Sequence, residues 1–419
     1  MKQVKAILIG AGLRGAEVYS EYALEHPNEF KVVAVAEPDV LKRDKFALNH
    51  GIPDNMRFND WNEILNQSIE ADCVMVCTQD RMHYAPVLLA LEKGYHVLCE
   101  KPMSPCKEEI IKMGKMAEKY NRLLVICHVL RYSSFFTKIK ELLEEDRIGE
   151  LVSIQHMESV GFWHYAHSFV RGNWRDSEET SPIILQKCCH DMDILLWLIN
   201  SRCTKVHSFG SLKYFKEENA PKNAPKYCLD GCIHRDTCPF YAPRFYFEHP
   251  RSELDGFIKA VNLDTSKEGV LKSLKTGPYG RCVFHCDNNV VDHQVVNLEF
   301  ENHVNASFTM CAFTNDCERV ISLMGTKGQI KANMEKGEIE IIDFVSGTEY
   351  QILLKTSSKG HNGSDMNMMR DFVSLLASDN SKTAKTTAKM SVESHLIALA
   401  AESSRVTGKI ITMDDYVTL

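Results

Sequence analysis

Short apolar runs alternate with amphipathic segments of helix length over the first 125 residues. The apolar runs are VKAILIG at 4–10, KVVAVAEPD at 31–39, DCVMVCT at 72–78, HVLCEKP at 96–102 and LLVICHVL at 123–130. Several are apolar without a polar alternation, which is typical of parallel strands that helices cover on both faces. Residues 1–125 are therefore predicted to form a doubly wound parallel sheet, a Rossmann domain.

The pattern changes in residues 126–419, which are predicted to form a C-terminal α/β domain. Longer, half-polar runs joined by short turns predict a large, mainly antiparallel open sheet there. The run LLVICHVLRY is expected to remain a strand up to Arg131 and Tyr132, and ILQKCCHDMDILLWLIN at 184–200 is expected to be one helix. Residues of about 221–290, rich in Pro and Cys, read as an insertion.

Composition narrows the class of protein. The chain of 419 residues is 44% hydrophobic and 25% charged, which fits two globular domains. No run reaches the roughly 18 apolar residues of a spanning helix, and the start reads as a strand rather than a signal peptide. A net charge of -7 gives no basic face for nucleic acid, and fifteen scattered cysteines favour reduced thiols. We expect a cytoplasmic protein with a small-molecule partner.

A glycine-rich turn follows the first strand. Gly10, Gly12 and Gly15 form a G-x-G-x-x-G run around Leu13 and Arg14, at the junction of a strand and a helix. Such glycines allow a tight turn, close approach of a pyrophosphate and close packing of the helix. A chance glycine turn is the alternative, but the surrounding strands favour a dinucleotide site.

Glu37 ends the second strand, where a carboxylate can bind the ribose hydroxyls of NAD and repel the 2′-phosphate of NADP. Arg43 lies close enough in sequence to keep NADP as the alternative cofactor. Ligands of such sheets bind beyond the carboxyl ends of the strands. By position, the further candidates for the cofactor site are Thr78, Gln79, His83, Glu100, Lys101 and Arg131, although His83 is equally consistent with a structural role at a helix start.

These residues resemble the glucose-fructose oxidoreductase and inositol dehydrogenase family (Gfo/Idh/MocA). The resemblance rests on GAGLRG, the acid in VAEPD, TQDRMHY, EKPM and HDMD. It implies NAD(P)-dependent oxidation or reduction of a secondary alcohol, usually of a sugar, polyol or cyclitol. It also implies a homodimer or homotetramer that forms through the sheet of the C-terminal domain.

Lys101 is the lysine of the family's E-K-P motif, which implies that it lies beside the nicotinamide and touches the reacting hydroxyl. Hydride transfer from a carbinol requires a group that takes the hydroxyl proton, and a partly desolvated lysine can do so. The resemblance also implies a cis bond to Pro102. The alternative is a solvated loop charge paired with Glu100.

The segment around His190 matches the family's D-x-x-x-H-x-x-D pattern at His190 and Asp193, but Gln186 stands at the first acidic position. We interpret His190 as the second catalytic group or as a residue that orients the substrate, and Gln186 as a hydrogen-bonding substrate contact. Within one helix, Gln186, Lys187 and His190 would share a face. Lys187 either supplies the missing polar function or is a structural charge.

A cluster between the predicted domains contains groups that bind sugars. Trp163 and Trp174 offer flat apolar faces, and neighbouring side chains offer hydrogen-bond donors. The predicted substrate contacts here are Tyr132, Trp163, His164, His167, Trp174 and Arg175, with Arg171 and Asn173 as further donors.

A structural zinc site is one interpretation of the cysteines in the insertion. Thiolates and imidazoles are zinc ligands, but these spacings are wider than the common C-x(2)-C. Reduced cysteines that fix a long loop are the other interpretation. The residues in question are Cys228, Cys232, His234, Cys238, Cys282, His285 and Cys286.

The predicted function is that of an NAD(P)-dependent dehydrogenase or reductase of a sugar-like alcohol. A redox-neutral, NAD-dependent glycosidase or lyase that forms a transient keto-sugar is the first alternative. A non-catalytic dinucleotide sensor is the second, supported by Gln186 at the acidic position and opposed by Lys101 and His190.

Overall fold

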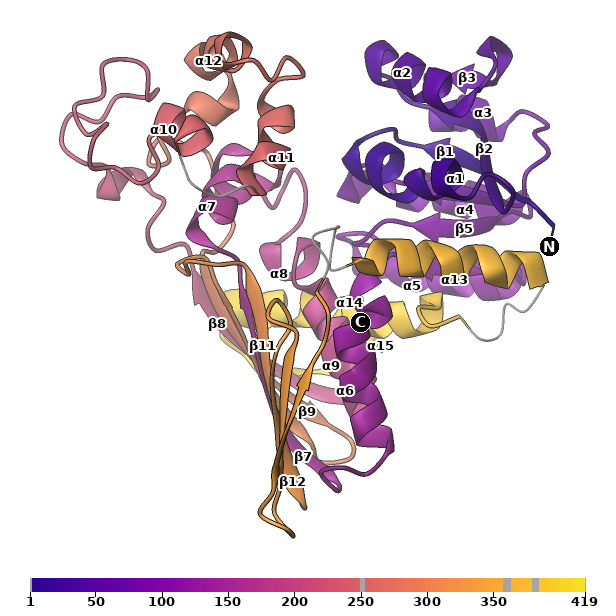
Figure 1. The fold of residues 1–419 in the computed structure, drawn as a ribbon, viewed down its shortest axis with the longest axis vertical. Helices are drawn as coiled ribbons and strands as arrows, with labels where there is room; N and C mark the ends of the chain where they lie inside the picture. Colours follow the sequence, from indigo (N-terminus) through magenta and orange to yellow (C-terminus); the bar gives the residue numbers. More distant parts are fainter. Residues whose placement is uncertain (1, 249–252, 357–362, 379–383, 419) are drawn as a thin grey trace.

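The computed structural model describes residues 2–248, 253–356, 363–378 and 384–418. Two sheets organise these residues, one of six strands and one of nine. In Figure 1 the six-stranded sheet and its helices form the upper right lobe, and the larger sheet extends downward from the centre. The predicted α/β class with two different sheets is confirmed.

The six-stranded sheet is parallel, in the order β3-β2-β1-β4-β5-β6. Its central strands are buried because helices pack on both faces, as a parallel sheet requires. The strands are β1 (Val4–Ile9), β2 (Phe30–Ala36), β3 (Arg57–Phe58), β4 (Cys73–Val76), β5 (His96–Cys99) and β6 (Leu124–Ile126). The helices are α1 (Glu21–Glu25), α2 (Val40–His50), α3 (Trp61–Leu65), α4 (Tyr84–Glu92) and α5 (Lys107–Lys119).

Two local predictions in this domain are wrong. The segment after the glycine turn is a π-helical turn, η1 (Leu13–Tyr19), followed by the short α1, rather than one α-helix. β6 ends at Ile126, and the next residues form a 3-10 turn, η4 (Val129–Tyr132), instead of extending the strand. The reason is that the pairing of β6 with β5 ends at Ile126, opposite Cys99, and the bridge on its other side, to Thr387, is made by Val125, so among the described residues the ladder does not extend beyond Ile126.

The nine-stranded sheet has the order β14-β13-β12-β11-β7-β10-β9-β8-β15. Only β7 and β10 pair in parallel, so the prediction of a mainly antiparallel sheet is confirmed. The strands are β7 (Leu151–Ser159), β8 (Cys203–Ser211), β9 (His293–Phe300), β10 (Asn305–Cys311), β11 (Glu318–Gly325), β12 (Gly328–Asn333), β13 (Glu338–Asp343), β14 (Glu349–Leu353) and β15 (Ile411–Thr412).

One face of this sheet packs against helices and forms the largest hydrophobic core. These helices are α6 (Ser134–Glu144), α9 (Cys189–Ile199) and α14 (Ala388–Thr407), beside α7 (Phe162–Tyr165), α8 (Ile183–Gln186) and α15 (Met413–Thr418). The opposite face carries exposed side chains, among them Phe209, Val295 and Val320. No helix in the described part of the chain is long and apolar enough to cross a membrane.

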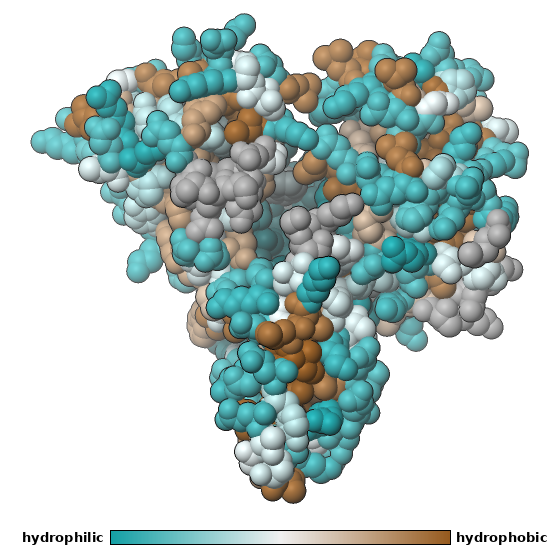
Figure 2. All heavy atoms as spheres, in the orientation of Figure 1, coloured by the Kyte–Doolittle hydropathy of each residue, from teal (hydrophilic) through white to brown (hydrophobic). Residues whose placement is uncertain are grey.

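The insertion forms a third lobe, at the upper left of Figure 1, from α10 (Ala242–Phe247), α11 (Glu253–Val261) and α12 (Lys267–Thr276). Residues 249–252 of the predicted insertion lie outside the described residues. Lys259 of α11 approaches Glu17 of η1, with 3.4 Å between Nζ and Oε2. Figure 2 shows the surface hollowed between this lobe and the Rossmann domain.

The end of the chain returns to the Rossmann domain. Met368, Met369 and Phe372 of α13 (Ser364–Ser378) are buried in the hydrophobic cluster that covers one face of the six-stranded sheet. The predicted division between residues 125 and 126 falls inside β6. Residues from the C-terminal part of the chain therefore contribute to the hydrophobic core of the Rossmann domain.

Candidate active site

The glycine turn is shaped by close backbone packing. A Cβ on Gly10, which has φ of +90°, would lie 2.6 Å from the carbonyl oxygen of Cys77, and one on Gly15 would lie 2.2 Å from that of Gly10. A Cβ on Gly12, in contrast, would meet no atom within 4 Å. The turn is thus packed against the sheet at Gly10 and Gly15 and open at Gly12, next to the exposed Leu13. This geometry fits a pyrophosphate at the start of η1.

Two polar groups at the ends of β2 and β4, the strands on either side of β1, fit the rest of a dinucleotide. The buried carboxylate of Glu37 accepts hydrogen bonds from the N–H groups of Ala11 at 2.8 Å and Asp39 at 3.0 Å. At the end of β4, the buried Oγ1 of Thr78 has no hydrogen-bond partner among the described residues. Gln79 follows in the same loop. NAD would thus meet a carboxylate at β2 and a hydroxyl at β4.

Arg14 and Glu100, both predicted at the cofactor site, contact each other. Arg14 Nε lies 2.8 Å from Glu100 Oε1, and its Nη2 lies 2.6 Å from Asp365 Oδ1 of α13. Tyr19 donates to the same Glu100 oxygen at 2.6 Å. Burial favours the neutral carboxyl, but the charges of Arg14 and Lys101 outweigh it and lower the pKa of Glu100. Sequence reasoning missed Tyr19 and Asp365, and no local pattern points to a partner so distant in the chain.

His83 is fully buried between two loops. Its Nδ1 lies 2.7 Å from the carbonyl oxygen of Pro102, and its Nε2 lies 3.0 Å from that of Thr78. Both ring nitrogens are therefore engaged with backbone, and the ring connects the loops after β4 and β5. Both contacts fit the structural role that the sequence left open.

Lys101 follows β5, and its peptide bond to Pro102 is cis, as the resemblance implies. Its Nζ donates to the carbonyl oxygen of Gln186 at 2.5 Å. That oxygen is available because the predicted continuous helix is wrong: α8 ends at Gln186 and α9 begins at Cys189. The last carbonyls of a helix lack intrahelical partners, and this one accepts the lysine.

His190 lies in the first turn of α9 and is 5% exposed. The ring centre of His128 lies 5.7 Å from that of His190 and 5.1 Å from that of His395. Burial, followed by the charges of Arg131 and Lys101, lowers the pKa of His128 far below its usual value. Burial also lowers the pKa of His395 to about 3, so both rings are neutral at pH 7. His128 was not predicted, although it follows β6 just as Lys101 follows β5.

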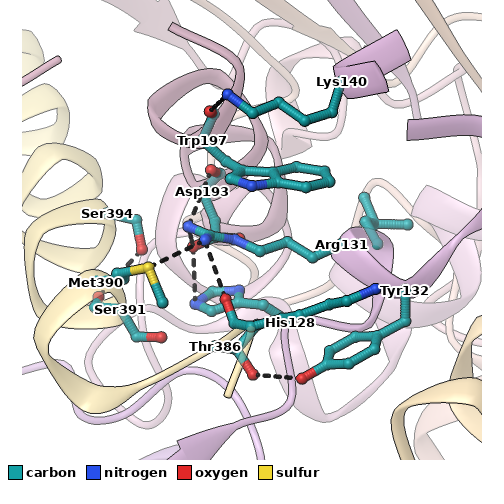
Figure 3. Close-up of polar contacts among 12 residues, drawn as sticks. His128, Arg131, Tyr132, Lys140, Asp193, Trp197, Thr386, Met390, Ser391 and Ser394 are labelled. Carbon is teal, nitrogen blue, oxygen red and sulfur yellow. Dashed lines mark hydrogen bonds and ion pairs between the residues drawn. The ribbon is translucent and has the colours of Figure 1, made fainter. Parts of the chain in front are cut away.

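Arg131 and Asp193 form a buried ion pair (Figure 3). Arg131 Nε and Nη2 donate to the two carboxylate oxygens at 2.6 and 2.7 Å, and Nη1 donates to the carbonyl oxygen of Lys385 at 3.1 Å. These contacts occupy the guanidinium, which was predicted at the cofactor site. They join η4 to α9 and so hold the helix that carries His190. Tyr132 points to Thr386, with 3.1 Å between the hydroxyl oxygens.

Gln186 and Lys187 do not share a helix face with His190, because the helix breaks between them. The side-chain amide of Gln186 donates to the carbonyl oxygen of Ser181, away from Lys101, and its Oε1 is buried without a partner among the described residues. Lys187 Nζ instead lies 2.9 Å from Glu158 Oε1 on β7.

Two histidines of the predicted aromatic and cationic cluster pack against Phe257 of the insertion. The ring centre of His164 lies 5.3 Å from that of Phe257 and 5.8 Å from that of Trp163, and Lys187 lies nearby. His167 is sandwiched between Phe257 and Tyr279 of the insertion, with ring centres 4.4 and 4.6 Å away, so it belongs to the core of that lobe.

Arg175 forms an ion pair with Asp287. It contacts both oxygens of Asp287, at 2.8 and 3.0 Å, and so fastens the segment after the insertion. Trp174 is 40% exposed beside it. Arg171 is fully buried and donates to the carbonyl oxygens of Phe240 and Arg281.

The zinc interpretation is not supported. Among the described residues, no three or more His, Cys, Asp or Glu side chains come together as a metal site. All fifteen cysteines lie in the described part of the chain, and none forms a disulfide. For the cysteines of the insertion, reduced thiols that pack a long loop are therefore the better interpretation.

Both parts of the chain match one family. Residues 4–128 match the oxidoreductase family with an NAD-binding Rossmann fold, and residues 140–413 match the C-terminal alpha/beta domain of the same family, GFO_IDH_MocA. The chain belongs to this oxidoreductase family, so the recognised resemblance is confirmed, together with its NAD(P)-binding domain.

Individual relatives are distant. The chain is 24% identical to the putative oxidoreductase YteT of Bacillus subtilis over 72% of its own length and 71% of that protein. It is 22% identical to inositol 2-dehydrogenase of Corynebacterium glutamicum over 49% of this chain and 57% of that one. A structure of levoglucosan dehydrogenase with NADH and levoglucosan has the same fold, with a TM-score of 0.71, 16% identity and coverage of 98% of this chain and 99% of that chain.

Proposed function

We propose that the protein oxidises or reduces a secondary alcohol of a sugar, polyol or cyclitol, with NAD as the hydride acceptor or donor. The observation that carries this proposal is the position of Lys101. Its amino group lies at the carboxyl end of the parallel sheet, beside the strand ends that fit a dinucleotide. It donates to the carbonyl oxygen of Gln186, which precedes His190 in the sequence. The likeness to inositol 2-dehydrogenase supports the substrate class.

Lys101 takes the hydroxyl proton as a neutral amine during oxidation and returns it from the ammonium form during reduction. One of its N–H groups is held by the Gln186 carbonyl, which fixes the direction of the amine. His190 orients the substrate oxygen from α9, and the buried Arg131–Asp193 pair holds that helix in position. Proton transfer by a positioned group of this kind contributes about 10²- to 10⁴-fold to a rate.

NAD is the preferred cofactor in this proposal. A carboxylate at Glu37 accepts hydrogen bonds from both ribose hydroxyls and repels a 2′-phosphate. Arg43, the residue that kept NADP open, has its Nε 3.5 Å from Asp44 Oδ1, and it also donates to Asn59. These contacts direct Arg43 to its own surface neighbours.

The protein assembles through the open face of the nine-stranded sheet in a homodimer or homotetramer. The strand register aligns Val320, Met157, Thr309, Val295 and Phe209 in one row across five strands. Phe209 is 62% exposed in the single chain, and Val320 and Val295 are 39% and 37% exposed. An apolar row of this kind on a sheet face is typical of an interface.

Incubation of the purified protein with NAD⁺ and a panel of polyols, inositols, sugars and aryl glycosides tests the proposed reaction. Net formation of NADH is the expected result. Release of the aglycone without net NADH would instead support the NAD-dependent glycosidase, and NAD binding with neither product would support the sensor. The same assay with NADP⁺ tests the cofactor preference.

A further inference from the structure

One peptide group next to Lys101 is bound by a histidine at each of its two polar atoms. This group joins Pro102 to Met103. Its carbonyl oxygen lies 2.7 Å from Nδ1 of His83, and its N–H donates to Nε2 of His395 at 3.0 Å. Both histidines are fully buried. His83 belongs to the loop after β4, whereas His395 lies on α14, outside the motifs that point to the site.

The hydrogen bonds of His395 define its protonation. A backbone N–H can only donate, so Nε2, which faces the N–H of Met103, carries no proton. Nδ1 lies 2.7 Å from the carbonyl oxygen of Ser391, which can only accept, so the ring proton is on Nδ1. Burial lowers the pKa of His395 to about 3, in agreement with a neutral ring. An apolar side chain here would leave the N–H of the buried Met103 without an acceptor, which is costly.

The hydrogen bond from Met103 to His395 connects two parts of the fold. Ile397, two residues after His395, is buried in the core of the nine-stranded sheet. Met103 is buried in a core cluster of the six-stranded sheet. The loop after β5 is therefore tied to the C-terminal domain at two points, by Met103 at His395 and by the side chain of Lys101 at the carbonyl oxygen of Gln186.

The main chain of Lys101 is held on both sides. Its own N–H donates to Oε2 of Glu100 at 2.6 Å, and the two histidines hold the peptide group between Pro102 and Met103. A lysine side chain is long and flexible, so the position of its amino group depends on how firmly its main chain is held. The contacts of this loop therefore help to place the amino group that donates to Gln186.

A row of three histidine rings leads from His395 to His190. The ring centre of His128 lies 5.1 Å from that of His395 and 5.7 Å from that of His190. His128 and His395 are fully buried, and close-packed side chains in a protein interior do not shift independently. A displacement of His395 would thus change the spacing between Lys101 and His190.

We propose that His395 is a positioning residue, which sets the place of the Lys101 amino group relative to His190 through the hydrogen bond that it accepts from Met103. This inference rests on the proposed function. Both ring nitrogens of His395 are engaged with backbone groups, so it acts through Lys101 and does not itself move a proton. Displacement of a reacting group by about 1 Å can lower a rate by about 10²-fold, so one such contact can control much of the activity.

Two amide substitutions separate the acceptor from the rest of the ring. In His395→Gln the amide oxygen can take the place of Nε2 and accept the N–H of Met103, whereas the shorter amide of His395→Asn can replace only Nδ1, next to Ser391. We expect His395→Asn to lower kcat by about 10- to 100-fold with a smaller change in KM, and His395→Gln to retain most of the activity. The value of kcat is taken per NADH-binding site, counted by fluorescence titration, so that a loss of folded protein does not register as a loss of rate.

His96→Gln is the matched control. His96 is the first residue of β5, at the opposite end of the strand from Lys101, and its Nδ1 accepts the N–H of Leu123 at 3.0 Å. Glutamine cannot replace Nδ1, so this variant also removes a ring nitrogen that accepts a backbone N–H. It should keep the wild-type kcat and KM per binding site. Thermal unfolding of all variants measures any loss of stability separately.

A double substitution tests whether His395 acts through Lys101. In the Lys101→Met background the positioned amine is absent, so His395→Asn should lower the residual kcat by less than about twofold. Losses from the two substitutions that multiply would overturn the inference. Equal losses of kcat in His395→Asn and His395→Gln, or a wild-type kcat per binding site in His395→Asn, would overturn it as well.

Competitive acetylation of lysines with acetic anhydride, read by mass spectrometry, follows the position of Lys101 without turnover. Lys101 should react several-fold faster in His395→Asn than in the wild type and in His395→Gln, while Lys331, which is 53% exposed on β12, should react equally in all three. This increase in a protein that forms no NADH with any substrate would support the inference and overturn the proposed reaction. NADH formation by the wild type with unchanged labelling of Lys101 would overturn the inference and leave the reaction intact. Absence of both effects would overturn both.

Discussion

At the scale of single residues, the hydrogen bond from Lys101 Nζ to the carbonyl oxygen of Gln186 joins the loop after β5 to the end of α8. Lys101 could be found because a charge that follows a buried strand is unusual, and its neighbours in the EKPM motif are specific. The contacts of Gln186 could not be found, because they depend on a helix break that the apolar pattern does not reveal. His128 had a usable signal, since it also follows a strand of the parallel sheet.

Glu37→Gln tests the discrimination between the two cofactors. The substitution removes the negative charge and keeps one oxygen, which can accept only one of the two N–H groups, of Ala11 and Asp39, that now bind the two carboxylate oxygens. We expect the ratio of the NADP to the NAD dissociation constant to fall by about tenfold or more, because a charge-assisted contact to the ribose is lost and a repulsion is removed. Fluorescence titration with both reduced cofactors measures this ratio.

Asp39→Asn provides the control for Glu37→Gln. Asp39 caps α2 by accepting hydrogen bonds from Leu41 and Lys42, and Asn caps helices equally well. The variant loses a charge two residues from Glu37 and should keep the cofactor ratio of the wild type. Equal ratios in Glu37→Gln and the wild type would contradict the role of Glu37.

At the scale of elements, the Rossmann strands were predictable because each is an apolar run that ends in a polar loop. β6 and η1 were not. The length of β6 is set by its pairing with β5, and a π-helical turn after the glycines depends on tertiary contacts. The packing of α13 on the Rossmann sheet also depends on contacts distant in sequence, which no periodicity encodes.

The Arg131–Asp193 pair joins η4 to α9, and Asp193→Asn tests its strength. The substitution keeps the shape of the side chain but leaves a buried guanidinium without its counter-charge. We expect the free energy of unfolding to fall by about 3–5 kcal/mol. Urea unfolding at neutral pH measures the change.

Glu340→Gln is the control for this pair. Glu340 forms an ion pair with Lys331 on the surface, where the two side chains are 44% and 53% exposed. Loss of such a pair should cost less than about 1 kcal/mol. Similar losses in the two variants would show that the Arg131–Asp193 pair does not hold the helix.

At the scale of the whole molecule, three parts converge on one region. The Rossmann domain contributes Lys101, the break between α8 and α9 contributes Lys187 and His190, and the insertion covers His164 and His167 through Phe257. Figure 2 shows a hollow between the insertion lobe and the Rossmann domain. The sequence motifs identified the two halves of the site, whereas only the fold brings Glu158 and Arg319 of the larger sheet next to Lys187.

The central claim is that Lys101 moves the proton that accompanies hydride transfer. The direct measurement is the rate of NADH formation by Lys101→Met, with the substrate that the wild type oxidises best, alongside NAD⁺ binding to the same variant. Lys107→Met on α5 is the control, since Lys107 Nζ contacts the carbonyl oxygen of Tyr416 and Glu108 instead. We predict that Lys101→Met lowers kcat by about 10²- to 10⁴-fold while NAD⁺ binding and the control remain close to wild type. A kcat within a few-fold of the wild type would contradict the account.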